Sequence, residues 1–149
     1  MTSLRPILLV EDNLNDIELT LAAFKQSNLA NEIVITRHGG EALDYLYRRA
    51  AFQDRIAGHP IVVFLDLKMP KVDGLEVLRQ MKSDEFLKVV PVVMLTSSRE
   101  EADLVKSYQL GVNAYVVKPV GFQQFADAIR QLGMFWAVVN ESPPNGIGD

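Results

Sequence analysis

The sequence predicts an α/β fold in which a doubly wound parallel sheet of five strands, in the order 2-1-3-4-5, is covered by five helices. The first observation is the run IVVFL at residues 61–65, which is typical of a strand buried on both faces of a parallel sheet. The second is that short apolar runs alternate along the chain with segments of helical periodicity. Such alternation favours right-handed crossovers, and 2-1-3-4-5 is a common order for five strands.

The first strand is expected at residues 6–10 (PILLV), because this apolar run stops abruptly at Glu11-Asp12. A helix is then expected to begin near Asn15-Asp16 and to stop at Asn28. Its apolar residues recur four and three positions apart, as a buried helix face requires: Ile17, Leu21 and Phe24.

The second strand is expected at residues 32–36 (EIVIT), and the second helix follows Gly39-Gly40. The apolar face of this helix carries four residues: Ala42, Leu43, Leu46 and Tyr47. Residues 48–60 are a long mixed connection. One interpretation is that they extend the second helix before the chain turns at Gly58-His59-Pro60.

The remaining elements follow the same rules. The strand at residues 61–65 leads to a helix from Gly74, and the strand at residues 91–95 leads to a helix at residues 100–110. The fifth strand, residues 114–117, ends at Lys118. A last helix has one apolar face: Phe122, Phe125, Ile129, Leu132 and Trp136.

The composition bounds the class of protein. With 149 residues, 48% hydrophobic and 23% charged, we expect one globular domain at residues 4–139, a disordered tail at residues 140–149 and no output domain. The absence of cysteine excludes disulfides, thiol catalysis and thiolate metal sites, and two histidines are too few for a His-rich metal site.

The net charge of −4 gives no reason to expect binding to nucleic acid or to an anionic membrane. The first residues have no signal-peptide pattern, and no apolar run approaches membrane-spanning length. We therefore expect a cytoplasmic protein.

Polar residues stand at the predicted carboxyl ends of strands 1, 3, 4 and 5. They are Glu11-Asp12, Asp66, Thr96-Ser97 and Lys118. Each has an ordinary structural explanation: Asp12 or Thr96 can cap a helix, Asp66 can be a turn residue, and Lys118 can be one more surface lysine. Because these four strand ends open onto the same edge of the sheet, their joint placement instead favours a site.

Carboxylates that share a cleft repel each other unless a cation intervenes, and hard oxygen ligands select Mg²⁺. We expect Mg²⁺ to be held by Asp12 and Asp66, by Glu11 through water, and by a backbone carbonyl near Lys68. Asp66 then has an oxygen free to attack phosphorus. Mg²⁺, the Lys118 ammonium and the Thr96 hydroxyl would neutralise the three phosphoryl oxygens.

These residues resemble the receiver domain of two-component response regulators, over about residues 4–138. The matching set is Glu11-Asp12, Asp66, Met69-Pro70, Asp73-Gly74, Thr96-Ser97 and Lys118-Pro119. The resemblance implies a flavodoxin-like receiver fold, phosphorylation of Asp66 by a histidine kinase, and a cis peptide bond between Lys118 and Pro119. It also implies that the chain is not an enzyme beyond self-phosphorylation and self-dephosphorylation.

In the family, a hydroxyl and an aromatic side chain move together on phosphorylation, and the matching residues are Thr96 and Tyr115. The alternative is that Tyr115 is a half-buried strand residue with no switching role. Lys68 departs from the common pattern at a position that faces the phosphoryl group in the family. It therefore leaves the lifetime of the aspartyl phosphate open in either direction.

Three stretches resemble one branch of the family, the stand-alone regulators of cyanobacterial phytochromes: residues 48–60, Phe86-Leu87-Lys88 and Phe135-Trp136. This resemblance implies a phytochrome-type histidine kinase as partner. Receiver domains often dimerise through the fourth helix, fifth strand and fifth helix. We therefore expect a homodimer that uses Tyr115, Phe135 and Trp136.

Other functions fit the sequence less well. A phosphatase of the haloacid-dehalogenase type expects an aspartate where Lys68 stands. A flavodoxin-like cofactor module needs a phosphate-cradling loop after the first strand, where Glu11-Asp12 would repel phosphate. A pseudo-receiver would lack the acceptor or metal carboxylates. A phosphotransfer shuttle to another protein remains an alternative output for a receiver.

Overall fold

The computed structural model describes residues 4–119 and 121–143 and has a five-stranded parallel sheet in the order β2-β1-β3-β4-β5. The predicted fold class is therefore confirmed. The strands are β1 (Ile7–Val10), β2 (Ile33–Thr36), β3 (Val62–Leu65), β4 (Val92–Thr96) and β5 (Ala114–Val117). The five α-helices are α1 (Leu14–Ser27), α2 (Gly39–Tyr47), α3 (Gly74–Ser83), α4 (Glu101–Gln109) and α5 (Phe122–Met134).

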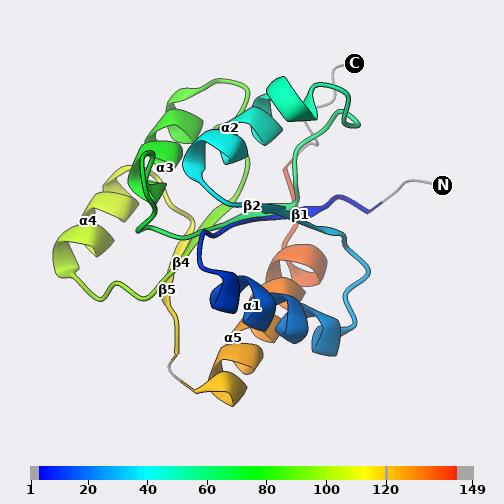
Figure 1. The fold of residues 1–149 in the computed structure, drawn as a ribbon, viewed down its shortest axis with the longest axis vertical. Coiled ribbons are helices and arrows are strands. Elements are labelled where there is room, and N and C mark those ends of the chain that lie inside the picture. Colours follow the sequence, from blue (N-terminus) through cyan, green and yellow to red (C-terminus); the bar gives the residue numbers. More distant parts are fainter. Residues whose placement is uncertain (1–3, 120, 144–149) are drawn as a thin grey trace.

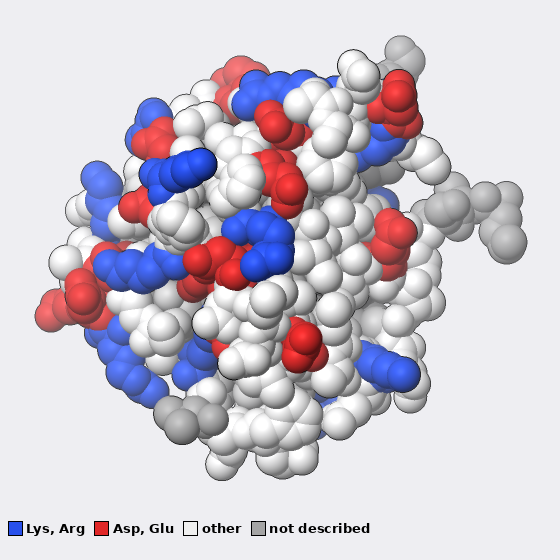
Figure 2. Space-filling model, in the orientation of Figure 1, with Lys and Arg blue, Asp and Glu red and all other residues white. Residues whose placement is uncertain are grey.

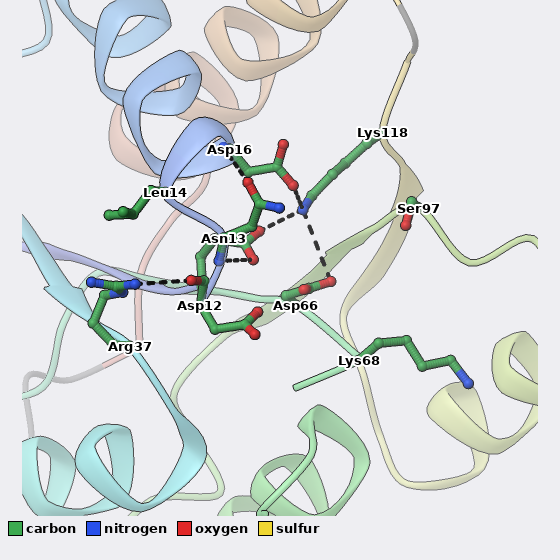
Figure 3. Close-up of a pocket in the computed structure, with 10 residues that line it drawn as sticks. Asp12, Asn13, Leu14, Asp16, Arg37, Asp66, Lys68, Ser97 and Lys118 are labelled. Carbon is green, nitrogen blue, oxygen red and sulfur yellow. Dashed lines mark hydrogen bonds and ion pairs between the residues drawn. The ribbon is translucent and has the colours of Figure 1, made fainter. Parts of the chain in front are cut away.

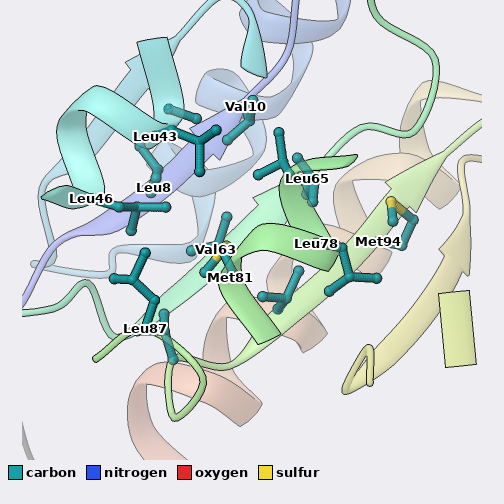
Figure 4. Packing of buried hydrophobic residues seen from close by; sticks show 14 of the residues in the cluster. Leu8, Val10, Leu43, Leu46, Val63, Leu65, Leu78, Met81, Leu87 and Met94 are labelled. Carbon is teal, nitrogen blue, oxygen red and sulfur yellow. The ribbon is translucent and has the colours of Figure 1, made fainter. Parts of the chain in front are cut away.

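Side chains alternate along the strands and divide the core into two layers. Helices α1 and α5 lie on one face of the sheet, and α2, α3 and α4 lie on the other (Figure 1). Leu8 and Val10 of β1 point into the layer beneath α2 and α3, which Figure 4 shows, whereas Ile7 and Leu9 point toward α1 and α5. β1 and β3 are buried on both faces, as their continuous apolar runs predict.

The ends of α1 follow local signals. The side chain of Asn13 accepts a hydrogen bond from the backbone N–H of Asp16 at 3.0 Å, so Asn13 is the N-cap, and Asp12 is not. Asn28 ends the helix in the left-handed conformation with φ 56°, which asparagine tolerates. The predicted stop at Asn28 is confirmed.

The connection after α2 is not a continuation of that helix. α2 ends at Tyr47, because Arg48 adopts φ 56°, and a single 3₁₀ turn, η1 (Ala50–Phe52), follows. The Nε of Arg55 donates to the carbonyl of Tyr45 at 2.7 Å. These contacts fold the connection back onto α2.

The last helix changes pitch near its end. α5 stops at Met134 and continues as a π-helix, η2 (Phe135–Val139). Beyond this π-helix, the carbonyl of Pro143 accepts a hydrogen bond from the Arg5 side chain at 3.2 Å. Of the predicted disordered tail, residues 144–149 lie outside the described residues.

Among the described residues, none of the helices has the length and apolar character needed to cross a membrane. Figure 2 shows acidic and basic side chains interspersed on the visible face of the molecule, with no continuous basic area there.

Candidate functional site

Of the predicted strand-end residues, all except Thr96 line one open pocket of about 540 Å³ at the carboxyl edge of the sheet (Figure 3). Its walls come from the segments that follow all five strands and from the first turn of α1. Its lining residues are Glu11, Asp12, Asn13, Leu14, Asp16, Arg37, Asp66, Lys68, Ser97 and Lys118.

Three carboxylates lie together in this pocket. Glu11, Asp12 and Asp66 each offer an oxygen within 4.8 Å of the others. Glu11 and Asp66 are buried and Asp12 is partly exposed. An all-oxygen set of this kind, open to water on one side, suits a hard divalent cation that keeps part of its hydration shell.

Asp66 sits directly after β3 on a tightly packed turn. Its Oδ1 accepts a hydrogen bond from the backbone N–H of Leu67 at 2.9 Å, which fixes the side chain. A Cβ added to Gly74 would lie 2.3 Å from the carbonyl oxygen of Asp66. The Asp73-Gly74 pair thus lets α3 begin against the turn at Asp66, while Asp73 caps that helix by accepting from Glu76 N–H at 3.0 Å.

The surroundings of Glu11 disfavour the charged form of its carboxyl group. Burial, with a smaller contribution from the charge of Asp66, raises the pKa of Glu11 to about 7, although the hydrogen bond and charge of Lys118 act in the opposite direction. Its Oε1 lies 2.5 Å from Lys118 Nζ, and its Oε2 accepts from Asn13 N–H at 3.2 Å. A bound cation would relieve the cost of keeping this buried carboxylate charged.

Lys118 reaches into the pocket from the end of β5. Its Nζ lies 2.8 Å from Asp16 Oδ2 and 4.0 Å from Asp66 Oδ1. Burial alone would lower the pKa of Lys118, but its hydrogen bonds to Asp16 and Glu11 and the charge of Asp66 raise it. The ammonium form of Lys118 therefore faces the Asp66 carboxylate.

Sequence reasoning missed two residues of the site. Asp16 shares the Lys118 ammonium with Glu11, and Arg37 donates to the carbonyl of Asp12 at 3.0 Å. Asp16 lies in the first turn of α1, just beyond the β1 loop, and that placement was a usable signal. Arg37 follows β2, whose end carried no predicted role.

Thr96 and Tyr115 are linked through Ser98. The buried Thr96 is not among the lining residues, and its Oγ1 accepts from Ser98 N–H at 3.2 Å. The Tyr115 hydroxyl donates to the carbonyl of Ser98 at 3.1 Å. Both predicted switch residues thus hold the loop between β4 and α4, and Ser97 of that loop lines the pocket.

The prediction of a cis peptide bond before Pro119 is wrong. No cis bond occurs among residues 4–119 and 121–143, so the bond between Lys118 and Pro119 is trans. The trans form of an X–Pro bond is intrinsically favoured by about 0.5–1 kcal/mol, so cis requires contacts that select it.

The residues of the expected dimer surface lie on different faces of the sheet. Tyr115 packs against the layer beneath α2 and α3, whereas Trp136 packs against the layer beneath α1 and α5. Phe135 is 46% exposed. Of these three residues, Phe135 offers the most accessible apolar surface.

Comparisons with known proteins identify the family of this chain. The family model "Response regulator receiver domain" matches residues 7–130. The probable methanogenesis regulatory protein FilR2 of Methanothrix harundinacea is 39% identical over 137 residues, which is 92% of this chain and 86% of that protein.

The similar solved structures include phytochrome response regulators. The phosphorylated cyanobacterial phytochrome response regulator RcpA is 37% identical with a TM-score of 0.89, over 95% of this chain and 100% of that chain. The bacteriophytochrome response regulator RtBRR is 61% identical with a TM-score of 0.77, over 95% of this chain and 86% of that chain. With its sheet order and its acidic pocket, this chain belongs to the response regulator receiver family and is similar to phytochrome response regulators.

Proposed function

We propose that this chain is a response regulator that accepts a phosphoryl group on Asp66 from a phytochrome-type histidine kinase. One observation carries the proposal: Asp66 lies within 4.8 Å of the carboxylates of Glu11 and Asp12, and 4.0 Å from the Lys118 ammonium. The names of the similar structures, which are phytochrome response regulators, support the choice of kinase class.

The donor set fits Mg²⁺. Asp12 and Asp66 would hold the ion directly, Glu11 would act through water, and the Lys68 carbonyl would complete the set. When bound, the cation supplies charge neutralisation for the incoming phosphoryl oxygens. The raised pKa of Glu11, about 7, supports this assignment, because burial and the nearby Asp66 disfavour its charge when no cation is present.

The chain's own residues perform the transfer by positioning and charge. A carboxylate oxygen of Asp66 forms a bond to phosphorus while the bond from phosphorus to the donor breaks, and its electron pair leaves with the donor. The Lys118 ammonium moves from Glu11 and Asp16 to the new phosphoryl group. We assign the chain no activity beyond self-phosphorylation and self-dephosphorylation.

Thr96 and Tyr115 would carry the signal. A phosphoryl group on Asp66 brings a charge of about −1.5 to −2, and the Thr96 hydroxyl would turn toward it. Ser98 N–H would then lose its acceptor, and Tyr115 would be free to turn inward. The loop between β4 and α4 is the two-state element in this account.

The output would be a contact with another protein in the cytoplasm, and no nucleic-acid or membrane contact is proposed. A homodimer through α4, β5 and α5 is favoured by exposed apolar side chains on α4: Leu104, Val105 and Tyr108. A monomer in sedimentation at micromolar concentration, with and without phosphorylation, would exclude this dimer. Transfer of the phosphoryl group onward to another protein is the alternative output.

The phosphorylation itself is tested with acetyl phosphate and Mg²⁺, followed by intact-mass measurement. One added phosphoryl group is expected on the native chain and on the control Asp54→Asn, because Asp54 is exposed and outside the pocket. None is expected on Asp66→Asn or after chelation. Steady hydrolysis of a small phosphate ester without an adduct would favour the phosphatase instead.

A further inference from the structure

The side chain of Lys68 points away from Asp66, the proposed phosphoryl acceptor. Lys68 lies two positions after Asp66 and lines the pocket. Its Nζ is instead 3.4 Å from Asp103 Oδ2 on α4, and Figure 3 shows the side chain directed away from Asp66. The structure therefore separates this ammonium from the acceptor.

Asp103 is well placed to hold that ammonium. Its side chain is 13% exposed, against 60% for Lys68. The same Oδ2 accepts a hydrogen bond from Ser98 Oγ at 2.6 Å. Asp103 is thus hydrogen-bonded to the loop between β4 and α4. The Lys68 side chain is long and flexible, and it can change its position relative to Asp103.

We propose that Asp103 is a positioning residue that holds the Lys68 ammonium out of the pocket until negative charge arrives beside Asp66. This inference rests on the proposed function of Asp66. The phosphodonor, and then the phosphoryl group, draws the ammonium from Asp103 into the pocket.

The relative charges give the direction of this exchange. Asp103 carries one negative charge, whereas a phosphoryl group carries about −1.5 to −2. The Lys68 side chain has four rotatable bonds and needs no backbone movement to change partner. When the ammonium leaves, the Asp103 side chain keeps only the hydrogen bond from Ser98 within residues 4–119 and 121–143. The exchange therefore also removes the ion pair that joins α4 to the loop after β3, which carries Lys68.

Asp103→Asn separates charge from shape, because the amide oxygen can still accept from Ser98 Oγ. Four proteins are needed: the native chain, Asp103→Asn, Lys68→Met and the double variant. The measurement is the rate constant of phosphorylation by acetyl phosphate with Mg²⁺ in excess, followed by intact mass. A loss of helix stability alone would act equally with and without Lys68, so the comparison isolates the ammonium.

With Lys68 present, Asp103→Asn is expected to raise the rate about threefold, the effect of one unit charge about 6 Å from the donor phosphate in water. The gain should shrink as salt rises from 0.01 M to about 1 M. In the Lys68→Met background, Asp103→Asn should change nothing.

An equal change in both backgrounds, or no change in either, overturns the positioning role of Asp103. These outcomes differ from failure of the proposed function. If the native chain takes up no phosphoryl group at all, the assignment of Asp66 fails first and this inference fails with it.

Discussion

The Lys118 ammonium is bonded to Glu11, with Nζ 2.5 Å from Oε1, and it stands 4.0 Å from Asp66 Oδ1. The cation that would neutralise a phosphoryl group is thus engaged elsewhere before phosphorylation. A divalent cation at the three carboxylates would compete with Lys118 for Glu11. Metal binding would therefore release the Lys118 ammonium from Glu11 and leave it available to a phosphoryl group.

The first prediction concerns pH and stability without metal. Because the folded-state pKa of Glu11 is about 7, above its ordinary value of 4.5, the folded chain binds this proton more tightly than the unfolded chain. Glu11 therefore lowers the free energy of unfolding as pH rises from about 4.5 to 7. Glu11→Gln should remove this loss and be more stable at pH 7 by on the order of 1–3 kcal/mol.

Urea unfolding at pH 5 and pH 7.5 in the presence of chelator measures the effect. Glu41→Gln serves as the control, because Glu41 lies in the first turn of α2, outside the pocket. If Glu11→Gln and Glu41→Gln show the same dependence on pH, the electrostatic account of Glu11 is wrong.

The second prediction concerns Lys118. Lys118→Met removes the ammonium that faces Asp66, and the rate of phosphorylation by acetyl phosphate should fall by about 10²-fold, a typical loss for one preorganised charge or donor. Lys82→Met is a control for loss of a partly buried lysine, because Lys82 Nζ instead contacts the carbonyl oxygens of Lys88 and Val90. A comparable loss of rate in both variants would mean that Lys118 acts only through stability.

The third prediction concerns the turn at Gly74. In Gly74→Ala, the added Cβ would lie 2.3 Å from the backbone oxygen of Asp66, so either α3 or the turn at Asp66 must shift. We expect a loss of about 1–3 kcal/mol in stability together with slower phosphorylation.

Gly40→Ala is the matched control, since its nearest contact would be 3.4 Å from the His38 ring. Inside α2 this change should stabilise the chain or leave it unchanged. Thermal unfolding and the acetyl phosphate assay check both variants, and a Gly74→Ala chain with native stability and rate would refute the crowding argument.

The fourth prediction concerns the coupling of Thr96 to Tyr115. Thr96→Val removes the hydroxyl but keeps the buried volume, so Asp66 should still be phosphorylated while Tyr115 keeps one environment throughout. Thr96→Ser retains the hydroxyl and should preserve the response. The aromatic NMR signals of Tyr115, recorded before and after phosphorylation, report the result. A full Tyr115 response in Thr96→Val would remove Thr96 from the switch.

The sequence was sufficient for the sheet order, because 2-1-3-4-5 is a common order for five strands that alternate with helices. It was sufficient for the pocket, because strand ends in a parallel sheet must meet at one edge. Asp66, Glu11 and Lys118 could be placed together on that ground alone. Side-chain partners could not be placed in the same way. The choice of Lys68 for Asp103 and of Lys118 for Asp16 depends on the positions of α4 and α1, which strand periodicity does not determine.

Two local features also escaped the sequence. The turn of π-helix at Phe135–Val139 continues an apolar helical pattern without a break, so no residue type marks the change in pitch. The trans bond before Pro119 depends on the surrounding contacts, because either isomer is accessible to an X–Pro bond.

The central claim is that Asp66 is the residue that accepts the phosphoryl group. Borohydride reduces an aspartyl phosphate to homoserine, and peptide mass mapping then locates the modified position after incubation with acetyl phosphate and Mg²⁺. Our account predicts homoserine at position 66 and at no other carboxylate of the pocket. Homoserine at position 12, or an unmodified peptide containing Asp66 in a chain that has gained a phosphoryl group, would contradict it.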